Sequence, residues 1–261
     1  MKRAIVLVSF GASHDNSRKL CLEALAEDFR KEFPEAVIRQ AYTSVFIRRA
    51  LEKRGLPIDS LEEALTHLAE ENIGEVLLQP TYMTPGEEYE KKVLAAVPKF
   101  APRFRKLTVG EPVFVKDEDY AKNLLAICRS IFVPRGTELV LLGHGSPHRH
   151  NPVYERLQQE IDAQGLPIHV GVIESTDTPD FSMVLERLKK SGTKAVLLAP
   201  LLLTSGMHVE RDLAGSSPAS WKSRFEAEGF AVTAITQGLG ESPFFRQLYL
   251  DKARQQLAAM D

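Results

Sequence analysis

Short apolar runs alternate with longer amphipathic segments along the whole chain. The apolar runs have the length and continuity of buried strands, and they cover residues 4–10, 36–43, 75–83, 106–113, 138–144, 169–175, 194–203 and 231–238. Between them, apolar side chains recur at helical spacing at 16–32, 60–71, 86–100, 117–132, 152–165, 181–192 and 243–259. Continuous apolar strands that alternate with helices predict an α/β fold with parallel sheets covered by helices on both faces.

Residues at the ends of the predicted helices support these assignments. Ser60 is the expected N-cap of the helix at 60–71, and Glu63 completes a capping box with it. Gly165 and Gly192 end the helices before them, because glycine readily adopts the left-handed conformation that closes a helix.

The two halves of the chain repeat three segments in the same order. LLQPTYMTPGEEYE (77–90) matches LLAPLLLTSGMHVE (197–210) without gaps, IVLVSFGASH (5–14) matches LVLLGHGSPH (139–148), and QAYTS (40–44) resembles VIEST (172–176). Such self-similarity indicates two copies of one α/β unit.

We therefore predict two similar doubly wound lobes, each a parallel sheet flanked by helices, with the active cleft between them. The lobes are expected at 1–133 and 134–261, with the final helix, 243–259, packing back on the first lobe. In such sheets, ligands bind beyond the carboxyl ends of the strands.

The two copies differ where ligands are expected. At three aligned strand ends the second copy carries a metal-binding side chain in place of another residue: His144 for Phe10, Glu174 for Tyr42 and His208 for Glu88. Taken singly, each has an ordinary explanation, since a histidine can bond a nearby carbonyl and a glutamate can cap a helix. Together, two imidazoles and a carboxylate predict a site for a borderline divalent metal, with positions left open for the metal to enter and leave.

Composition narrows the classes of function. The formal net charge is −2, and no long run of one sign occurs, so neither nucleic acid nor an anionic membrane is an expected partner. Cys21 and Cys128 lie in apolar helical patterns and are expected to be buried, reduced thiols. The N-terminal apolar run is too short for a signal peptide, and no apolar stretch reaches 18 residues. We therefore expect a cytoplasmic protein.

The chain resembles the class II chelatases of tetrapyrrole biosynthesis, and among them the anaerobic sirohydrochlorin cobaltochelatases. The resemblance covers nearly the whole chain, and its carriers are VSFGAS (8–13), YTS (42–44), GEEYEK (86–91), GHGSPH (143–148), VIES (172–175), LLLTSGMH (201–208), SWKSRFEAEG (220–229) and GLGE (238–241). It implies two α/β lobes with the tetrapyrrole in the cleft, and metal coordination by His144, Glu174 and His208. It also implies that His144 accepts a proton.

The function implied by this resemblance is insertion of Co2+ into sirohydrochlorin, with release of two protons, early in anaerobic cobalamin biosynthesis. The metal is a substrate, Fe2+ or Ni2+ are alternatives to Co2+, and no organic cofactor is expected. A ferrochelatase acting on sirohydrochlorin or a porphyrin, and a carrier that binds metal or tetrapyrrole without catalysis, stay open as alternatives. The sequence also leaves a homo-oligomer open.

Roles for individual side chains follow from the chemistry of metal insertion. Neutral His144 or His208 can accept a pyrrole proton, and Glu88 is a candidate to relay a proton or to orient His208. The expected substrate contacts lie at strand ends and in the loops after them: Ser9, Phe10, Gly11, Ser13, Met83 and Ser146.

Overall fold

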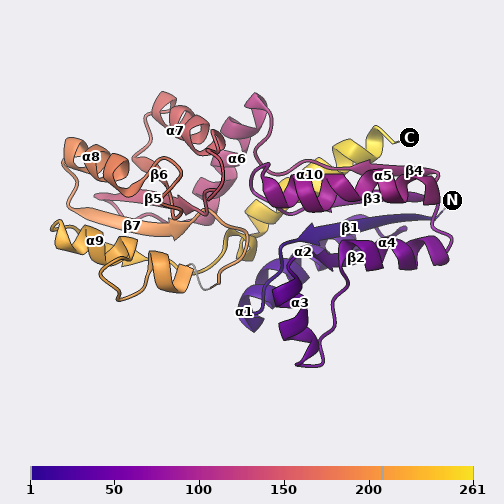
Figure 1. Ribbon diagram of the computed structural model, residues 1–261. Helices are drawn as coiled ribbons and strands as arrows, with labels where there is room; N and C mark the ends of the chain where they lie inside the picture. The colour runs from indigo at the N-terminus through magenta and orange to yellow at the C-terminus, as the bar shows by residue number, and fades with distance from the viewer. Residues whose placement is uncertain (1, 207–208, 261) are drawn as a thin grey trace. The chain divides into compact units, whose positions relative to one another are not determined.

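The computed structural model describes residues 2–206 and 209–260. The chain forms two compact units (Figure 1). The first unit comprises residues 1–115 together with 240–261, and the second comprises residues 116–239.

The first unit is built on a parallel sheet of four strands in the order β2-β1-β3-β4. These strands are β1 (Arg3–Ser9), β2 (Ala36–Tyr42), β3 (Glu75–Pro80) and β4 (Lys106–Val109). Its helical segments are α1 (Asp15–Ser17), η1 (Arg18–Glu23), α2 (Ala24–Glu32), α3 (Val45–Glu52), α4 (Leu61–Glu70), η2 (Tyr89–Val93), η3 (Leu94–Ala96), α5 (Val97–Phe100), η4 (Ala101–Arg103) and α10 (Pro243–Ala258).

Alternate residues of β1 supply one core of this unit. Ala4, Val6 and Val8 are buried in one cluster with Leu65 and Leu68 of α4, because alternate side chains of a strand point to the same face. Helix α4 therefore covers the face of the sheet to which these side chains point.

The second unit has the same strand topology, β6-β5-β7-β8, again all parallel. Its strands are β5 (Thr137–Gly143), β6 (Ile168–Val172), β7 (Ala195–Pro200) and β8 (Ala231–Ala234). Its helical segments are α6 (Asp117–Ser130), α7 (Val153–Ala163), α8 (Phe181–Ser191), η5 (Val209–Leu213) and α9 (Trp221–Ala227), and η6 (Leu239–Glu241) lies where the chain returns to the first unit.

The SWK motif of the second unit (residues 220–222) contributes to the hydrophobic core of that unit. Trp221 is buried beside Phe181 and Phe225, with ring centroids 5.2 and 5.8 Å away. A Cβ on Gly171 of β6 would lie 2.6 Å from the Trp221 ring, so only glycine fits there. Ser220 caps the helix by accepting a bond from the Ser223 backbone N–H. This motif therefore marks a packing requirement rather than the chemistry of the site.

The two parallel sheets flanked by helices confirm the predicted fold class. All eight predicted strands are present, although most end a few residues earlier than predicted. The capping box of α4 is confirmed, with the Ser60 N–H donating to Glu63 at 2.7 Å and the Glu63 N–H donating to Ser60 at 3.2 Å. Gly192 ends α8 at φ +79° as predicted. The prediction omitted the helical segments α3, η5 and α9.

The division into units differs from the predicted lobe boundary at residue 134. Helix α6 belongs to the second unit, where Arg156 of α7 bonds Asp117 at 3.3 Å and lies over the Tyr120 ring. Helix α10 belongs to the first unit, and there the buried Tyr249 hydroxyl donates to the Thr81 carbonyl at 3.0 Å.

The two cysteines are unbridged thiols that differ in exposure. Cys21 is buried, whereas Cys128 is only half-buried, so the expectation of two buried thiols was wrong for Cys128. Burial raises the pKa of the Cys21 thiol to about 12, which keeps it protonated and unreactive. Within residues 2–206 and 209–260, no helix is both long and apolar enough to cross a membrane.

Candidate functional site

His144 and Glu174 lie next to each other at the carboxyl ends of neighbouring strands. His144 directly follows β5, and Glu174 lies two residues beyond β6. The backbone N–H of Glu174 donates to the His144 carbonyl at 3.0 Å, extending the ladder that pairs the two strands. Both residues are half-buried. The structure therefore brings together two of the three predicted metal ligands.

Two glycines allow this close approach. A Cβ on Gly143 would lie 2.2 Å from the Tyr154 ring, and the Tyr154 hydroxyl accepts a bond from the Gly145 N–H at 3.3 Å. Gly145 has φ +78°, and a Cβ there would lie 3.1 Å from the Cβ of Glu174. The G-H-G sequence thus fixes the chain around His144 against its neighbours.

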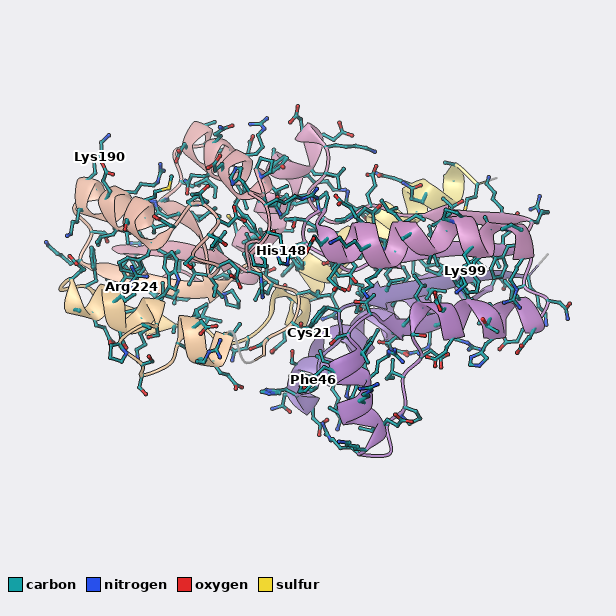
Figure 2. The ribbon with its side chains drawn as sticks, viewed as in Figure 1. Cys21, Phe46, Lys99, His148, Lys190 and Arg224 are labelled. Atoms are coloured by element: carbon teal, nitrogen blue, oxygen red, sulfur yellow. The ribbon has the colours of Figure 1, made fainter. Side chains whose placement is uncertain are left out.

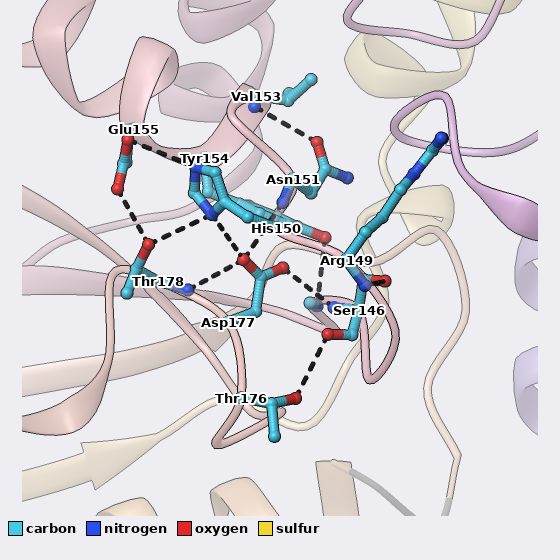
Figure 3. Close-up of polar contacts among 11 residues, drawn as sticks. Ser146, Arg149, His150, Asn151, Val153, Tyr154, Glu155, Thr176, Asp177 and Thr178 are labelled. Atoms are coloured by element: carbon cyan, nitrogen blue, oxygen red, sulfur yellow. Dashed lines mark hydrogen bonds and ion pairs between the residues drawn. The ribbon is translucent and has the colours of Figure 1, made fainter.

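A buried carboxylate organises the loop that follows His144 (Figure 3). Asp177 accepts bonds from the backbone N–H groups of Ser146, Asn151 and Thr178 at 2.9, 3.1 and 2.9 Å. It also contacts Nδ1 of His150 at 2.9 Å. The loop at 146–151 is therefore fixed to one side chain.

The strand register corrects the predicted equivalence of Glu174 with Tyr42. In the first unit, the Ser44 N–H donates to the Phe10 carbonyl, as the Glu174 N–H does to that of His144. Tyr42 pairs with the last residue of β1, and Val172 pairs with the last residue of β5. Glu174 is thus the structural counterpart of Ser44 and not of Tyr42. The sequence match of QAYTS with VIEST is therefore shifted by two residues from the structural equivalence.

The strand ends of the first unit carry a chain of hydroxyls that reaches Glu88. Thr43 donates to Glu88 Oε2 at 2.8 Å, and its Oγ1 lies 3.0 Å from the Tyr82 hydroxyl. Because Thr43 has a single hydroxyl hydrogen, Tyr82 must be the donor in the second bond. Burial raises the pKa of the Tyr82 hydroxyl, so this donor keeps its proton near neutral pH.

The predicted substrate contacts of the first unit differ in exposure. Ser9 is buried, and its Oγ accepts a bond from Thr81 at 2.9 Å, while Met83 is also buried. Phe10 is 49% exposed. Gly11 has φ +109°, and a Cβ there would lie 2.7 Å from the Tyr42 ring.

Two more predicted contacts lie in the loops after β1 and β5. Ser13 is half-buried, and its carbonyl accepts a bond from Arg54 at 2.7 Å. Ser146 is half-buried, and its Oγ accepts a bond from the Arg149 N–H at 3.3 Å.

Phe46, at the start of α3, is a further exposed side chain near the carboxyl end of β2 (Figure 2), and it is 75% exposed.

The third predicted ligand, His208, lies outside the described residues. Within the described part of the chain, no three His, Cys, Asp or Glu side chains form a metal-binding group. The structure therefore places His144 and Glu174 together, and the full His-Glu-His set stays a prediction from the sequence.

Three polar residues of these strand ends were missed by the sequence analysis. Thr43 and Tyr82 lie inside the segments that repeat between the two halves of the chain. The sequence does not show which group a hydroxyl at a strand end will bond. Asp177 follows Thr176 and precedes Thr178-Pro179, a composition typical of an exposed turn, whereas its side chain has no exposed surface. Its burial depends on the tertiary structure, so only the folded chain reveals it.

Comparison with solved structures identifies the fold. The chain superimposes on SirB from Bacillus subtilis with a TM-score of 0.67 and 15% sequence identity, over 98% of this chain and 95% of SirB. SirB is described as a sirohydrochlorin chelatase. The two units of this chain thus have the fold of that protein.

Comparison of sequences identifies the family. The profile of the family described as cobalt chelatase (CbiK) matches residues 3–258. The sirohydrochlorin cobaltochelatase of Salmonella typhimurium is 34% identical over 98% of this chain and 97% of its own length. The sirohydrochlorin cobaltochelatase CbiKC of Nitratidesulfovibrio vulgaris is 30% identical over 100% of this chain and 92% of its own. The chain belongs to the cobalt chelatase (CbiK) family, which confirms the predicted family of chelatases.

Proposed function

We propose that this protein inserts Co2+ into sirohydrochlorin, with release of two pyrrole protons, as a step of cobalamin biosynthesis. The observation that carries this proposal is the family match over residues 3–258, together with relatives of nearly equal length that bear this activity in their names. The adjoining positions of His144 and Glu174 support a metal-binding site in the second unit.

The metal is a substrate that must bind and then leave. An imidazole from His144 and a carboxylate from Glu174 are ligands that suit a first-row divalent ion. His208 is the third ligand that the sequence predicts. A three-ligand set leaves open positions, so the ion can exchange protein ligands for pyrrole nitrogens.

The two pyrrole protons need acceptors as the metal enters the ring. A neutral imidazole suits this task near pH 7, and His144 is the proposed first acceptor. Glu88 is the proposed second acceptor or relay, because the Thr43 hydroxyl, which accepts from Tyr82, donates to one carboxylate oxygen of Glu88 and leaves the other to bind a proton.

The carboxylates of the macrocycle need hydrogen-bond donors from the protein. The Ser146 hydroxyl accepts its bond from the Arg149 N–H, so its own hydrogen can point to a substrate carboxylate. The loop after β5 thus combines a proposed metal ligand with a proposed substrate contact.

The test is anaerobic metallation of sirohydrochlorin followed by visible absorption. We expect the wild-type protein to accelerate Co2+ insertion over a control without enzyme, and His144→Ala to lose this acceleration while keeping its far-UV circular dichroism. His148→Ala is the matched control, since His148 is an exposed histidine of the same loop and should leave the rate unchanged.

Other outcomes would overturn the proposal in recognisable ways. Normal turnover by His144→Ala would remove the proposed role of His144. Faster insertion of Fe2+ than of Co2+ would indicate a ferrochelatase, and bound but unmetallated sirohydrochlorin with either ion would indicate a carrier.

A further inference from the structure

Asp177 is a fully buried carboxylate that is held by backbone hydrogen bonds and a contact with the His150 ring. Its side chain has no exposed surface, and its oxygens accept from three backbone N–H groups and face the His150 ring. Burying a carboxylate is costly unless such bonds replace its hydration. With no exposed surface and with both oxygens accepting from backbone N–H groups, Asp177 is not placed to bind a metal ion itself.

The two oxygens of Asp177 hold different parts of the chain. Oδ2 accepts from the N–H of Ser146, two residues after His144. Oδ1 accepts from Asn151 and Thr178, at the far end of the loop and next to Asp177 itself. Only the bond at Oδ2 therefore acts directly on the segment that carries His144.

The backbone of Asp177 is tied to the other proposed ligand. Its N–H donates to the Glu174 carbonyl at 3.1 Å. A Cβ on Gly145 would lie 3.1 Å from that of Glu174 and 3.4 Å from that of Asp177. The segments at 144–146 and 174–177 thus pack directly against each other, with Asp177 bonded to both.

The equivalent position in the first unit shows what this aspartate adds. Gly11, the counterpart of Gly145, packs against Ile47 where Gly145 packs against Asp177. Ile47 is buried and apolar. An apolar side chain is therefore sufficient for packing at this place in the fold, and the polar replacement occurs in the unit that carries His144 and Glu174.

We propose that Asp177 is a positioning residue that fixes His144 relative to Glu174 for metal binding, an inference that rests on the proposed metal-ligand roles of both. The carboxylate sets the path of residues 144–146 through Ser146, and its own backbone sets the turn after Glu174. Loss of the Oδ2 acceptor would let the His144 segment shift away from Glu174.

The test variant is Asp177→Asn. An asparagine oxygen can serve the donors of Asn151, Thr178 and His150, but its NH2 group then faces the Ser146 N–H, two donors that cannot bond. We expect the affinity for Co2+ to fall about 10- to 100-fold, as for other groups that orient metal ligands. The affinity for sirohydrochlorin alone should fall less than the affinity for Co2+, since Ser146 is only one of the proposed contacts to the ring.

The measurement is titration of the complete protein with Co2+ in the absence of sirohydrochlorin, followed by the visible d–d bands of the ion. His150→Ala is the matched control. Of the contacts that Asp177 makes, this variant removes only one, at Oδ1 of Asp177, and it should leave Co2+ affinity unchanged. Asp177→Glu keeps the charge with a longer side chain, and we expect it to bind Co2+ better than Asp177→Asn. This second variant also serves if the asparagine variant does not fold.

Each outcome decides the inference. Wild-type Co2+ affinity and bands in folded Asp177→Asn would overturn it, as would weaker Co2+ binding by Asp177→Glu than by Asp177→Asn, an equal loss in His150→Ala, or absence of Co2+ binding by the wild type. Co2+ binding without metallation of sirohydrochlorin would refute the proposed function, and the comparison of variants would still decide the role of Asp177.

Discussion

At the scale of single residues, the strand ends of the two units carry different side chains on the same backbone. Phe10 and His144 occupy equivalent positions, and so do Ser44 and Glu174. In the first unit, Glu88 accepts a hydrogen bond at the end of a chain of hydroxyls. In the proposed function, metal binding falls to His144 and Glu174, and proton transfer falls to His144 and Glu88.

Glu88→Gln should separate these roles. The glutamine oxygen can still accept the Thr43 bond, but the side chain no longer takes up a proton. We expect kcat for Co2+ insertion to fall on the order of 100-fold, in the range of general base catalysis, while KM for Co2+ changes less than about twofold. Steady-state metallation kinetics measure both. Thr43→Val should lower kcat less, because it keeps the carboxylate, and an unchanged kcat in Glu88→Gln would exclude this role.

The sequence predicted part of the candidate site and missed part of it for a physical reason. His144 and Glu174 were predicted because each differs from its counterpart at a strand end. The counterpart assigned to Glu174 was off by two residues, since a strand alternates its faces every two residues and a shift of two preserves the apolar pattern. Asp177 gave no signal, because burial of a turn aspartate is decided by the chain that folds over it.

At the scale of elements, the strands were the easiest to predict and the irregular helices the hardest. Strands β1, β5 and β7 are near-continuous apolar runs, which are typical of buried parallel strands. Helix α3 was missed although its eight residues are strongly amphipathic, and its first turn exposes two apolar side chains, Val45 and Phe46, which are 46% and 75% exposed. The π-helical turns of η1, η2 and η5 depend on backbone packing that side-chain spacing does not encode.

The element β6 is joined to its neighbours through a buried histidine. His169 Nε2 lies 2.6 Å from Glu138 of β5, and Arg187 of α8 donates to His169 Nδ1 at 3.2 Å. Because arginine can only donate, Nδ1 carries no proton and the ring is neutral. Burial lowers the pKa of His169 below its ordinary 6.5, against the opposing effect of Glu138, while Arg187 lowers it further and Asp162 raises it.

The second unit should therefore lose stability in acid. A histidine with a lowered folded pKa stabilises the fold above its unfolded pKa of about 6.5, and this contribution is lost as pH falls toward the folded value. Each unit of lowering corresponds to about 1.4 kcal/mol. Urea unfolding at pH 7.5 and 5.5 can be followed by Trp221, the single tryptophan of the chain. We expect a smaller drop for His169→Gln than for the wild type, and equal drops would contradict the prediction.

At the scale of the whole molecule, the second unit is continuous in sequence and the first is not. Residues 116–239 contain all strands of one sheet, whereas the other unit needs 1–115 and 240–261 together. In the first unit, Arg246 of α10 bonds Asp28 of α2 at 2.6 Å, and Tyr249 bonds the Thr81 carbonyl. Helix α10 is therefore a part of the first core and not an appendage.

Fragments of the chain should behave accordingly. The fragment 116–239 should unfold cooperatively in urea, seen by Trp221 fluorescence and far-UV circular dichroism. The fragment 134–261, cut at the boundary suggested by the sequence, should be markedly less stable, because it lacks α6 and exposes the apolar face of α10. Equal stability of the two fragments would show that α6 contributes nothing to the second unit.

The discontinuous first unit also bears on how the protein is made. Domains commonly fold one after another as the ribosome delivers them, the N-terminal one first. Here the ribosome delivers every residue of the second unit before it reaches Gly240, so the first unit is the last to have all its parts. Strand β3 and helix α2 must therefore wait for α10, which packs against both, and until α10 emerges the surfaces that it covers depend on transient cover.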